Sequence, residues 1–287
     1  MALTDDNVRL KAVNHVTYNV RDKVKALRFW EDVLGVKRIP SQVDSEHIIW
    51  LQIPSGAMIH LIETPDGPSI PSHHGAFEVD FNRKSDIDAE HLTASEVNTQ
   101  IMELMKAGYG HIIVKNPGAK HSIGVGILNR LKLTFQGSLG YFGVGLIDGP
   151  NVQITGRVGW GCGENMKSGT VVIEKNAGSS FGAGLRGGDL VCKGNVGSRT
   201  GISMKGGTII VGGRTGYLSG FMMQRGRMII LGDADENLGD SMYDGTIYVG
   251  GKIADLGVDA VEGEMTDLDR EWLTRKLAQY GLEAPNG

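Results

Sequence analysis

The sequence predicts a mainly β protein: a right-handed parallel β-helix with a 19-residue repeat, preceded by a small α+β module of βαβββ order and ended by a short helix. Three observations predict this fold class. Glycine accounts for 43 of the 287 residues, about twice its usual share. Thirty of these glycines lie in residues 132–251 and only four in residues 1–86, so the chain has two parts of different construction. In the second part, glycines and short apolar segments recur every 19 residues.

Charge and composition exclude several classes of protein. The formal charge is −4 at pH 7 and 40% of the residues are hydrophobic, which predicts a folded protein without the basic field that nucleic-acid binding requires. The N-terminal residues contain no apolar signal-peptide core, and no run of about 18 apolar residues occurs, so neither secretion nor a membrane span is expected. Two cysteines cannot build a disulfide framework. We therefore expect a cytoplasmic protein.

The repeat consists of residue columns with a 19-residue period. Glycine occupies all but one position of a column that runs through Gly137, Gly156, Lys175, Gly194, Gly213, Gly232 and Gly251. It fills another column at Gly169, Gly188, Gly207, Gly226 and Gly245. After the second column, each repeat has a strand-like segment with two alternating apolar positions, such as Val171 and Ile173, as a strand with one buried face requires. A further apolar column, which contains Met166, Leu185 and Met204, suggests a second short inward-facing strand. A 19-residue unit suits one coil of a parallel β-helix, and about seven to eight coils are expected.

The N-terminal part follows a different pattern. Alternation of apolar residues predicts a strand over residues 13–20, and apolar side chains at helical spacing predict a helix over residues 23–34. Three further strands are expected over residues 36–40, 46–53 and 58–63, which completes a βαβββ order.

The two parts and the C-terminus define four segments. Residues 81–92 are charged and lack periodicity, so we expect a connecting segment there, and residues 111–115 are expected to form the first rung of the β-helix. Leucines and a tryptophan at helical spacing over residues 267–281 predict a capping or docking helix. The predicted segments are the module (1–82), a linker and helical lead-in (83–110), the β-helix (111–262) and the C-terminal helix and tail (263–287).

The residues of the repeat resemble a known family. Residues 159–166 (GWGCGENM), followed by KSGTVVIEKNAGSS, RGGDLVCKGNVGSRTGISMKGGTIIVGG and LGDADENLGDSMYDGTIYVGG, are similar to the GXGXG repeat domain of glutamate synthase, and the resemblance covers residues 87–281. In that family the domain is the C-terminal β-helix of the large subunit. It also occurs as a stand-alone subunit, notably in N-methylglutamate synthase, and in one subunit of formylmethanofuran dehydrogenase. The lead-in over residues 87–127 resembles the start of the stand-alone subunits, which favours that form.

The resemblance implies a scaffold role within an amidotransferase complex. In glutamate synthase the domain has no recognised catalytic residues, and residues 112–260 contain no phosphate loop, zinc pattern or nucleophile–base arrangement. We therefore expect no catalytic and no cofactor-binding residue in this chain. The implied complex is a hetero-oligomer with a class II glutamine-amidotransferase-like subunit and an FMN-binding synthase subunit, where the partners hold the FMN and any iron–sulfur cluster. The closest reaction is N-methylglutamate formation from methylamine and glutamate, and the GXGXG-bearing subunit of a formylmethanofuran dehydrogenase is an alternative.

The N-terminal module resembles one module of the vicinal oxygen chelate superfamily, which includes glyoxalase I and extradiol dioxygenases. The residues that carry the resemblance are NHVTYNVRD, FWEDVLGVK and IHLIE, and residues 73–79 resemble the opening strand of a second module that then stops. The resemblance implies a divalent metal held by His15, Glu63 and His74, a ligand set that suits Ni, Zn, Fe or Mn. The complete cup of this superfamily needs two modules, so a second chain would supply the other half. The alternative function is thus a metal-dependent lyase or dioxygenase with the β-helix as an oligomerisation platform.

Two further side-chain sets are candidates for function. Lys167, Arg186 and Lys205 occupy one column of the repeat, so they repel one another unless an acidic partner or a bound anion neutralises them. We therefore expect this column to contact a partner. Cys162 at a turn and Cys192 on an inward strand position are expected to be small structural residues and not reactive thiols.

Overall fold

The computed structural model describes residues 15–20, 22–33, 36–40, 46–52, 58–63 and 83–285. The chain divides into two units, Met1–Gly75 and Ala76–Gly287. None of the helices in the described residues is long and apolar enough to cross a membrane.

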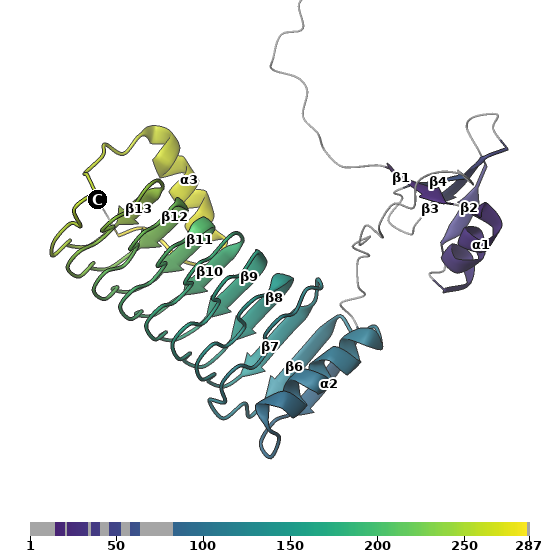
Figure 1. Ribbon diagram of the computed structural model, residues 1–287, viewed down its shortest axis with the longest axis horizontal. Helices are drawn as coiled ribbons and strands as arrows, with labels where there is room; N and C mark the ends of the chain where they lie inside the picture. Colours follow the sequence, from purple (N-terminus) through teal and green to yellow (C-terminus); the bar gives the residue numbers. More distant parts are fainter. Residues whose placement is uncertain are drawn as a thin grey trace, which may run out of the picture. The chain divides into compact units, whose positions relative to one another are not determined.

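The N-terminal unit has the predicted βαβββ order (Figure 1). Its elements are β1 (His15–Val20), α1 (Lys23–Arg28), a π-helical turn η1 (Phe29–Val33), β2 (Lys37–Ile39), β3 (Ile48–Gln52) and β4 (Met58–Glu63). The strands lie in the order β1-β4-β3-β2, with β1 parallel to β4 and the other pairs antiparallel. A small core of Trp30, Val36, Ile49, Leu51, Ile59 and Leu61 holds the sheet against the helix.

The second unit is a parallel β-solenoid of about seven turns between residues 111 and 249, as the glycine and strand periods predict. Its sheet contains β5 (Lys84–Asp88), β6 (His111–Lys115), β7 (Lys132–Gln136), β8 (Asp148–Ile154), β9 (Ser168–Ile173), β10 (Asp189–Cys192), β11 (Lys205–Val211), β12 (Arg225–Ile230) and β13 (Thr246–Val249). The strands stack in sequence order (Figure 1). Leu190 pairs with Val171 on one side and Ile209 on the other, so equivalent positions of the repeat are neighbours in space.

Left-handed backbone explains the glycine pattern at one corner of each coil. Three residues spaced by two take positive φ there, for example Gly161, Gly163 and Asn165 at 66°, 71° and 55°. At Gly163 a Cβ would also lie 2.8 Å from Cδ2 of Leu190. Glycine suits this position both for the backbone conformation and for space, whereas Val144 takes the equivalent position one coil earlier at a φ of 50°.

The buried columns agree with the prediction, but the methionine column is not a strand. Met166, Leu185 and Met204 are fully buried in the solenoid core. Their backbone lies in the turn that precedes the long strand, where the N–H of Met166 donates to the carbonyl of Gly163. The expected second strand is therefore wrong at this position. Isolated bridges such as Val158 to Ala177 form the second line of pairing instead.

The first strand of the solenoid lies in a segment that we expected to be connecting. Residues 84–88 form β5, which pairs in parallel with β6, so the sheet begins before residue 111. The sequence KSDID lacks the apolar alternation of the later strands because only Ile87 is fully buried at this end of the sheet. A polar strand is typical of a sheet edge.

Helix α2 (Ala94–Lys106) covers the N-terminal end of the solenoid core (Figure 1). It begins with a capping box in which Thr93 and Glu96 bond each other's backbone N–H groups. Val97 and Ile101 enter the core. The side chain of Asn98 replaces a missing coil, because its Oδ1 accepts from the N–H of Gly124 and its Nδ2 donates to the carbonyl of Ser122, both at 2.8 Å.

Helix α3 (Asp267–Ala278) packs against the outer face of the sheet (Figure 1). Of the two predicted roles, capping or docking, this position corresponds to docking. Leu273 and Leu277 lie on an outward column of the last four strands, formed by Val191, Ile210, Ile229 and Tyr248. Polar contacts fix both ends of the helix. Tyr248 donates to Asp269 at 2.8 Å, and both Lys276 and Tyr280 donate to the carboxylate of Asp189.

Candidate functional site

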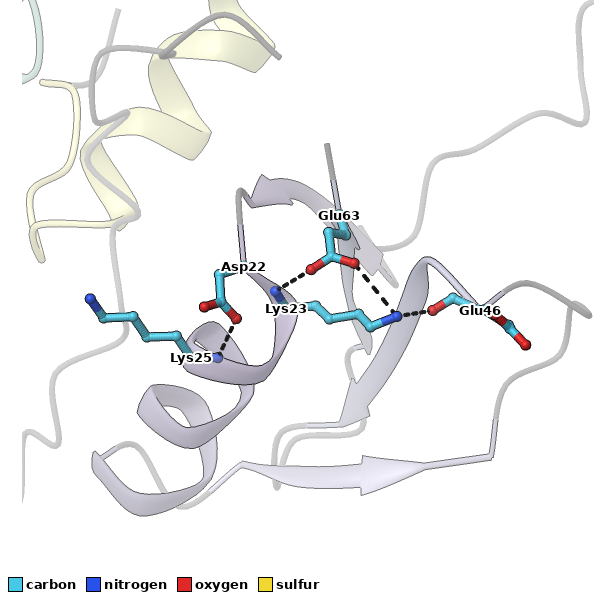
Figure 2. Close-up of polar contacts among 5 residues, drawn as sticks. All are labelled: Asp22, Lys23, Lys25, Glu46 and Glu63. Atoms are coloured by element: carbon cyan, nitrogen blue, oxygen red, sulfur yellow. Dashed lines mark hydrogen bonds and ion pairs between the residues drawn. The ribbon is translucent and has the colours of Figure 1, made fainter. Parts of the chain in front are cut away.

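The carboxylate of Glu63, a predicted metal ligand, is held by the first turn of α1 (Figure 2). One oxygen accepts from the backbone N–H of Lys23 at 3.1 Å, and the other lies 3.6 Å from the Lys23 ammonium. That ammonium also donates to the carbonyl of Glu46, while Asp22 caps the helix by accepting from the N–H of Lys25. Glu63 therefore ties the end of β4 to the start of the helix, and a cation at this carboxylate would compete with Lys23.

The three predicted metal ligands are not brought together in the described residues. Strands β1 and β4 lie side by side, as expected, but His15 pairs with Met58 whereas Glu63 pairs with Val20. Five residues of strand separate the two positions, which corresponds to roughly 16 Å. His74 lies outside the described residues. Within those residues, no group of three or more His, Cys, Asp or Glu side chains could hold a metal ion. The ligand set does not fit one site in a single module, and the metal remains a prediction.

Sequence reasoning missed two features of this unit. His60 of β4 lies opposite Trp50 of β3, and the two ring centroids are 3.8 Å apart. The signal was the single polar residue between apolar ones in IHLIE. Lys23 was also missed as the partner of Glu63, although its place after the helix cap Asp22 puts its N–H at the open end of the helix.

The predicted partner-contact column lies on one edge of the solenoid. Lys167, Arg186 and Lys205 are all exposed. Each donates its backbone N–H to the preceding coil, at Ile147, Met166 and Leu185 respectively. Adjacent members are therefore separated by one coil, or about 4.8 Å along the axis. Among the described residues no ion pair neutralises them. We refer to these three residues as the cationic column.

Both thiols are buried, including that of Cys162, for which the sequence predicted only a turn. Burial raises the pKa of the Cys162 thiol far above its usual range. Burial also raises the pKa of Cys192 to about 11. The Cys192 thiol donates to the carbonyl of Lys175 at 3.0 Å. Since the thiolate is the nucleophile, neither side chain is prepared for covalent catalysis at neutral pH.

Two surface features of the solenoid have no counterpart in the predictions. The rings of His121, Tyr141 and Trp160 stack on successive coils, with centroids 4.5 and 5.4 Å apart. Tyr141 and Trp160 are half exposed, and their 19-residue separation was the available signal. Beside the end of α3, an open hollow of about 650 Å³ lies over the outer face of β7 to β9 and is lined by polar side chains such as Gln153 and Glu174.

The solenoid matches a known protein family. Residues 105–277 match the family model described as GXGXG motif. The chain belongs to the GXGXG motif family. Residues 12–120 match the model of the Glyoxalase/Bleomycin resistance protein/Dioxygenase superfamily. This second match continues through β5, α2 and β6, which the structure places in the GXGXG solenoid. A comparison with curated proteins found no match.

Proposed function

We propose that this GXGXG protein is a non-catalytic scaffold subunit of a glutamate-synthase-like amidotransferase complex, of the N-methylglutamate synthase type. The observation that carries the proposal is the solenoid itself, whose match to the GXGXG family covers residues 105–277. Apolar side chains fill its interior, both thiols are buried there, and the cationic column points outward. These features support a role through surfaces and not through reactive groups.

In the proposed complex the solenoid bridges two catalytic subunits. A class II glutamine-amidotransferase-like subunit releases ammonia or an amine, and an FMN-binding synthase subunit uses it. The partners hold the FMN and any iron–sulfur cluster. A rigid rod suits this task because every coil is hydrogen-bonded to both neighbours, which fixes the distance between surfaces on different coils.

Affinity purification of the tagged full-length chain from its native host tests the proposal. We expect an FMN-barrel protein and an amidotransferase-like protein in fixed ratio, identified by mass spectrometry, together with flavin absorbance. The purified complex is then expected to form N-methylglutamate from methylamine and glutamate. Recovery of the chain without any flavoprotein, at low salt and without detergent, contradicts the scaffold role.

The match to the glyoxalase superfamily favours a second candidate, a metal-dependent lyase or dioxygenase. The strand register weighs against it within one module, because His15 and Glu63 lie at opposite ends of the strand pair. Metal analysis of the purified chain separates the two candidates. Stoichiometric divalent metal that is lost in both His15→Ala and His74→Ala supports the second function, whereas no bound metal excludes it.

A further inference from the structure

The charges of the solenoid are divided along its axis. Residues 104–231 contain fifteen Lys and Arg against four Asp and Glu, whereas residues 232–271 contain two against twelve. The two regions meet at the ion pair between Arg225 and Asp244, whose charged atoms are 4.0 Å apart. Successive coils are about 4.8 Å apart, so Arg186 lies about three coils, or roughly 14 Å, from the coil of Asp244, which exceeds the Debye length of about 8 Å at physiological salt. Away from this boundary, the basic coils and the acidic end therefore do not neutralise each other within one molecule.

The acidic end also exposes apolar side chains. Val258, Val261 and Leu268 are 89%, 88% and 77% exposed, and acidic residues lie between them in the sequence. Within the described chain, the backbone N–H and C=O groups of residues 261–265 make no hydrogen bond to protein. This stretch therefore offers apolar side chains, carboxylates and open backbone groups to a partner surface. We refer to residues 258–268 as the terminal segment.

The cationic column and the terminal segment share one edge of the solenoid. The column continues through Gln224 and Tyr243, whose N–H groups donate to the preceding coil in the same pattern as Lys205. The turn from Gly257 to Ala260 repeats the turn from Gly239 to Met242, so Val261 lies one coil beyond Tyr243, although its N–H makes no bond to the preceding coil. From Arg186 to Val261 is four coils, or about 19 Å.

We propose that this edge is self-complementary and that two copies of the chain pair along it, side by side and antiparallel. A two-fold axis at Gln224 places Arg186 of each copy against the terminal segment of the other, and Lys205 against Tyr243. The residue on the axis is uncharged, and the neighbouring cation Arg225 is paired with Asp244 of its own chain. Each contact occurs twice and the assembly closes at two chains, as an isologous interface does. The acidic surface predicted for the cationic column is thus the end of a second copy.

Charge reversal tests this pairing on the full-length chain. The first variant carries Lys167→Glu, Arg186→Glu and Lys205→Glu, and the second carries Glu262→Lys and Glu264→Lys. A matched control carries Arg157→Glu, Lys175→Glu and Arg214→Glu, which are exposed residues at the corner that follows the long strand. Far-UV circular dichroism verifies that all variants are folded. Sedimentation velocity measures association at roughly 50 mM and roughly 500 mM salt, because the Debye length shortens about threefold between them.

The wild-type chain and the control are expected to be dimers at low salt and to dissociate at high salt. Each reversal variant alone is expected to raise the dissociation constant at least about 100-fold, since like charges then meet in the interface. A mixture of the two variants restores the dimer, because each reversed surface faces one of opposite charge. A monomeric wild-type chain at low salt overturns the proposal. A dimer that both variants retain also overturns it, and places the dimer contact elsewhere, for example in the N-terminal unit.

Discussion

Residues with a left-handed backbone conformation form one corner of each coil. The space available for a side chain differs from one of these positions to the next. Gly163 and Gly126 have nearly the same φ, 71° and 69°. A Cβ at Gly163 would lie 2.8 Å from Leu190, whereas a Cβ at Gly126 would have no heavy atom within 4 Å. The two glycines thus separate the cost of backbone strain from the cost of overpacking.

Gly126→Ala is expected to lower the free energy of unfolding of the solenoid by about 1 kcal/mol, the cost of a left-handed alanine. Gly163→Ala is expected to cost about 2–4 kcal/mol, because displacement of Leu190 adds to that strain. Urea unfolding followed by circular dichroism measures both. Equal losses in the two variants would show that the core accommodates the extra methyl group without strain.

Burial of Cys192 predicts how stability depends on pH. Its pKa of about 11 in the folded chain is above the ordinary thiol value of 9.0, so above pH 9 the unfolded chain loses a proton that the folded chain keeps. Stability is therefore fully present below pH 9 and falls between pH 9 and 11. The loss is expected to approach about 2–3 kcal/mol for this group.

Urea unfolding of Cys192→Ala at pH 8, 9 and 10 checks this expectation. The variant should be less stable at pH 8 because a buried group is removed, but its stability should fall less steeply with pH than that of the wild type. Parallel pH profiles would indicate that the thiol titrates normally. In the native protein both thiols should also resist Ellman's reagent at pH 8 and react after unfolding.

At the scale of elements, α2 closes one end of the solenoid with a side chain in place of a coil. The side-chain amide of Asn98 hydrogen-bonds the backbone of Ser122 and Gly124. It takes the place of the backbone groups that a preceding coil would supply. A buried backbone group without a partner costs about 1–3 kcal/mol. The cap therefore contributes mainly through the part-buried N–H of Gly124.

Asn98→Leu is expected to lower the free energy of unfolding of the solenoid by about 1–2 kcal/mol, because the part-buried N–H of Gly124 loses its partner while the carbonyl of exposed Ser122 can bond water. Asn98→Asp keeps the acceptor for Gly124 and should cost less. Exposed Thr99→Ala, the next residue of the helix, serves as the control. Hydrogen exchange at Gly124 should accelerate in Asn98→Leu, and unchanged exchange there would contradict the capping role.

Helix α3 shows what sequence patterns can and cannot establish about an element. Its existence follows from helical spacing, but its position follows from an outward column that is apolar without interruption from β9 to β13, where Val172, Val191, Ile210, Ile229 and Tyr248 lie. On β7 and β8 the same column holds Thr134 and Gln153, and no helix covers them. That change in polarity was present in the sequence. It becomes informative only when the second face of each strand is considered.

At the scale of the whole molecule, the chain contains two units with separate cores. The N-terminal core and the solenoid core share no residue. Cooperative unfolding extends over contacts within a core, so the units are expected to unfold in two transitions.

Leu61→Ala is expected to lower the midpoint of one transition and leave the other unchanged, since fully buried Leu61 belongs to the N-terminal core. Leu133→Ala, equally buried in the solenoid, should do the reverse. Each substitution should cost about 2–5 kcal/mol. Scanning calorimetry measures both midpoints. A single transition that both substitutions shift would show that the units unfold together.

Much of this fold is predictable because its signals are periodic. The 19-residue columns predict the solenoid, and alternation predicts the four strands of the N-terminal unit. Strand β5 escapes prediction because an edge strand buries little and keeps a polar sequence. The positions of His15 and Glu63 escape it for another reason. Their separation depends on the register between β1 and β4, which is set by pairing over some forty residues of chain.

The coils of the solenoid stack at a constant spacing, so positions along its axis differ by whole numbers of coils. Removing one whole repeat, such as residues 189–207, keeps every column in phase and shortens the rod by about 4.8 Å. Within residues 132–249, removing a number of residues that is not a multiple of 19 moves the following glycines away from the left-handed corners unless a loop absorbs the difference, as in the coil from Lys115 to Gln136. The distance between two surfaces on different coils can therefore change during evolution only by whole coil spacings. A partner that contacts both surfaces must change the distance between its own contact sites by the same amount.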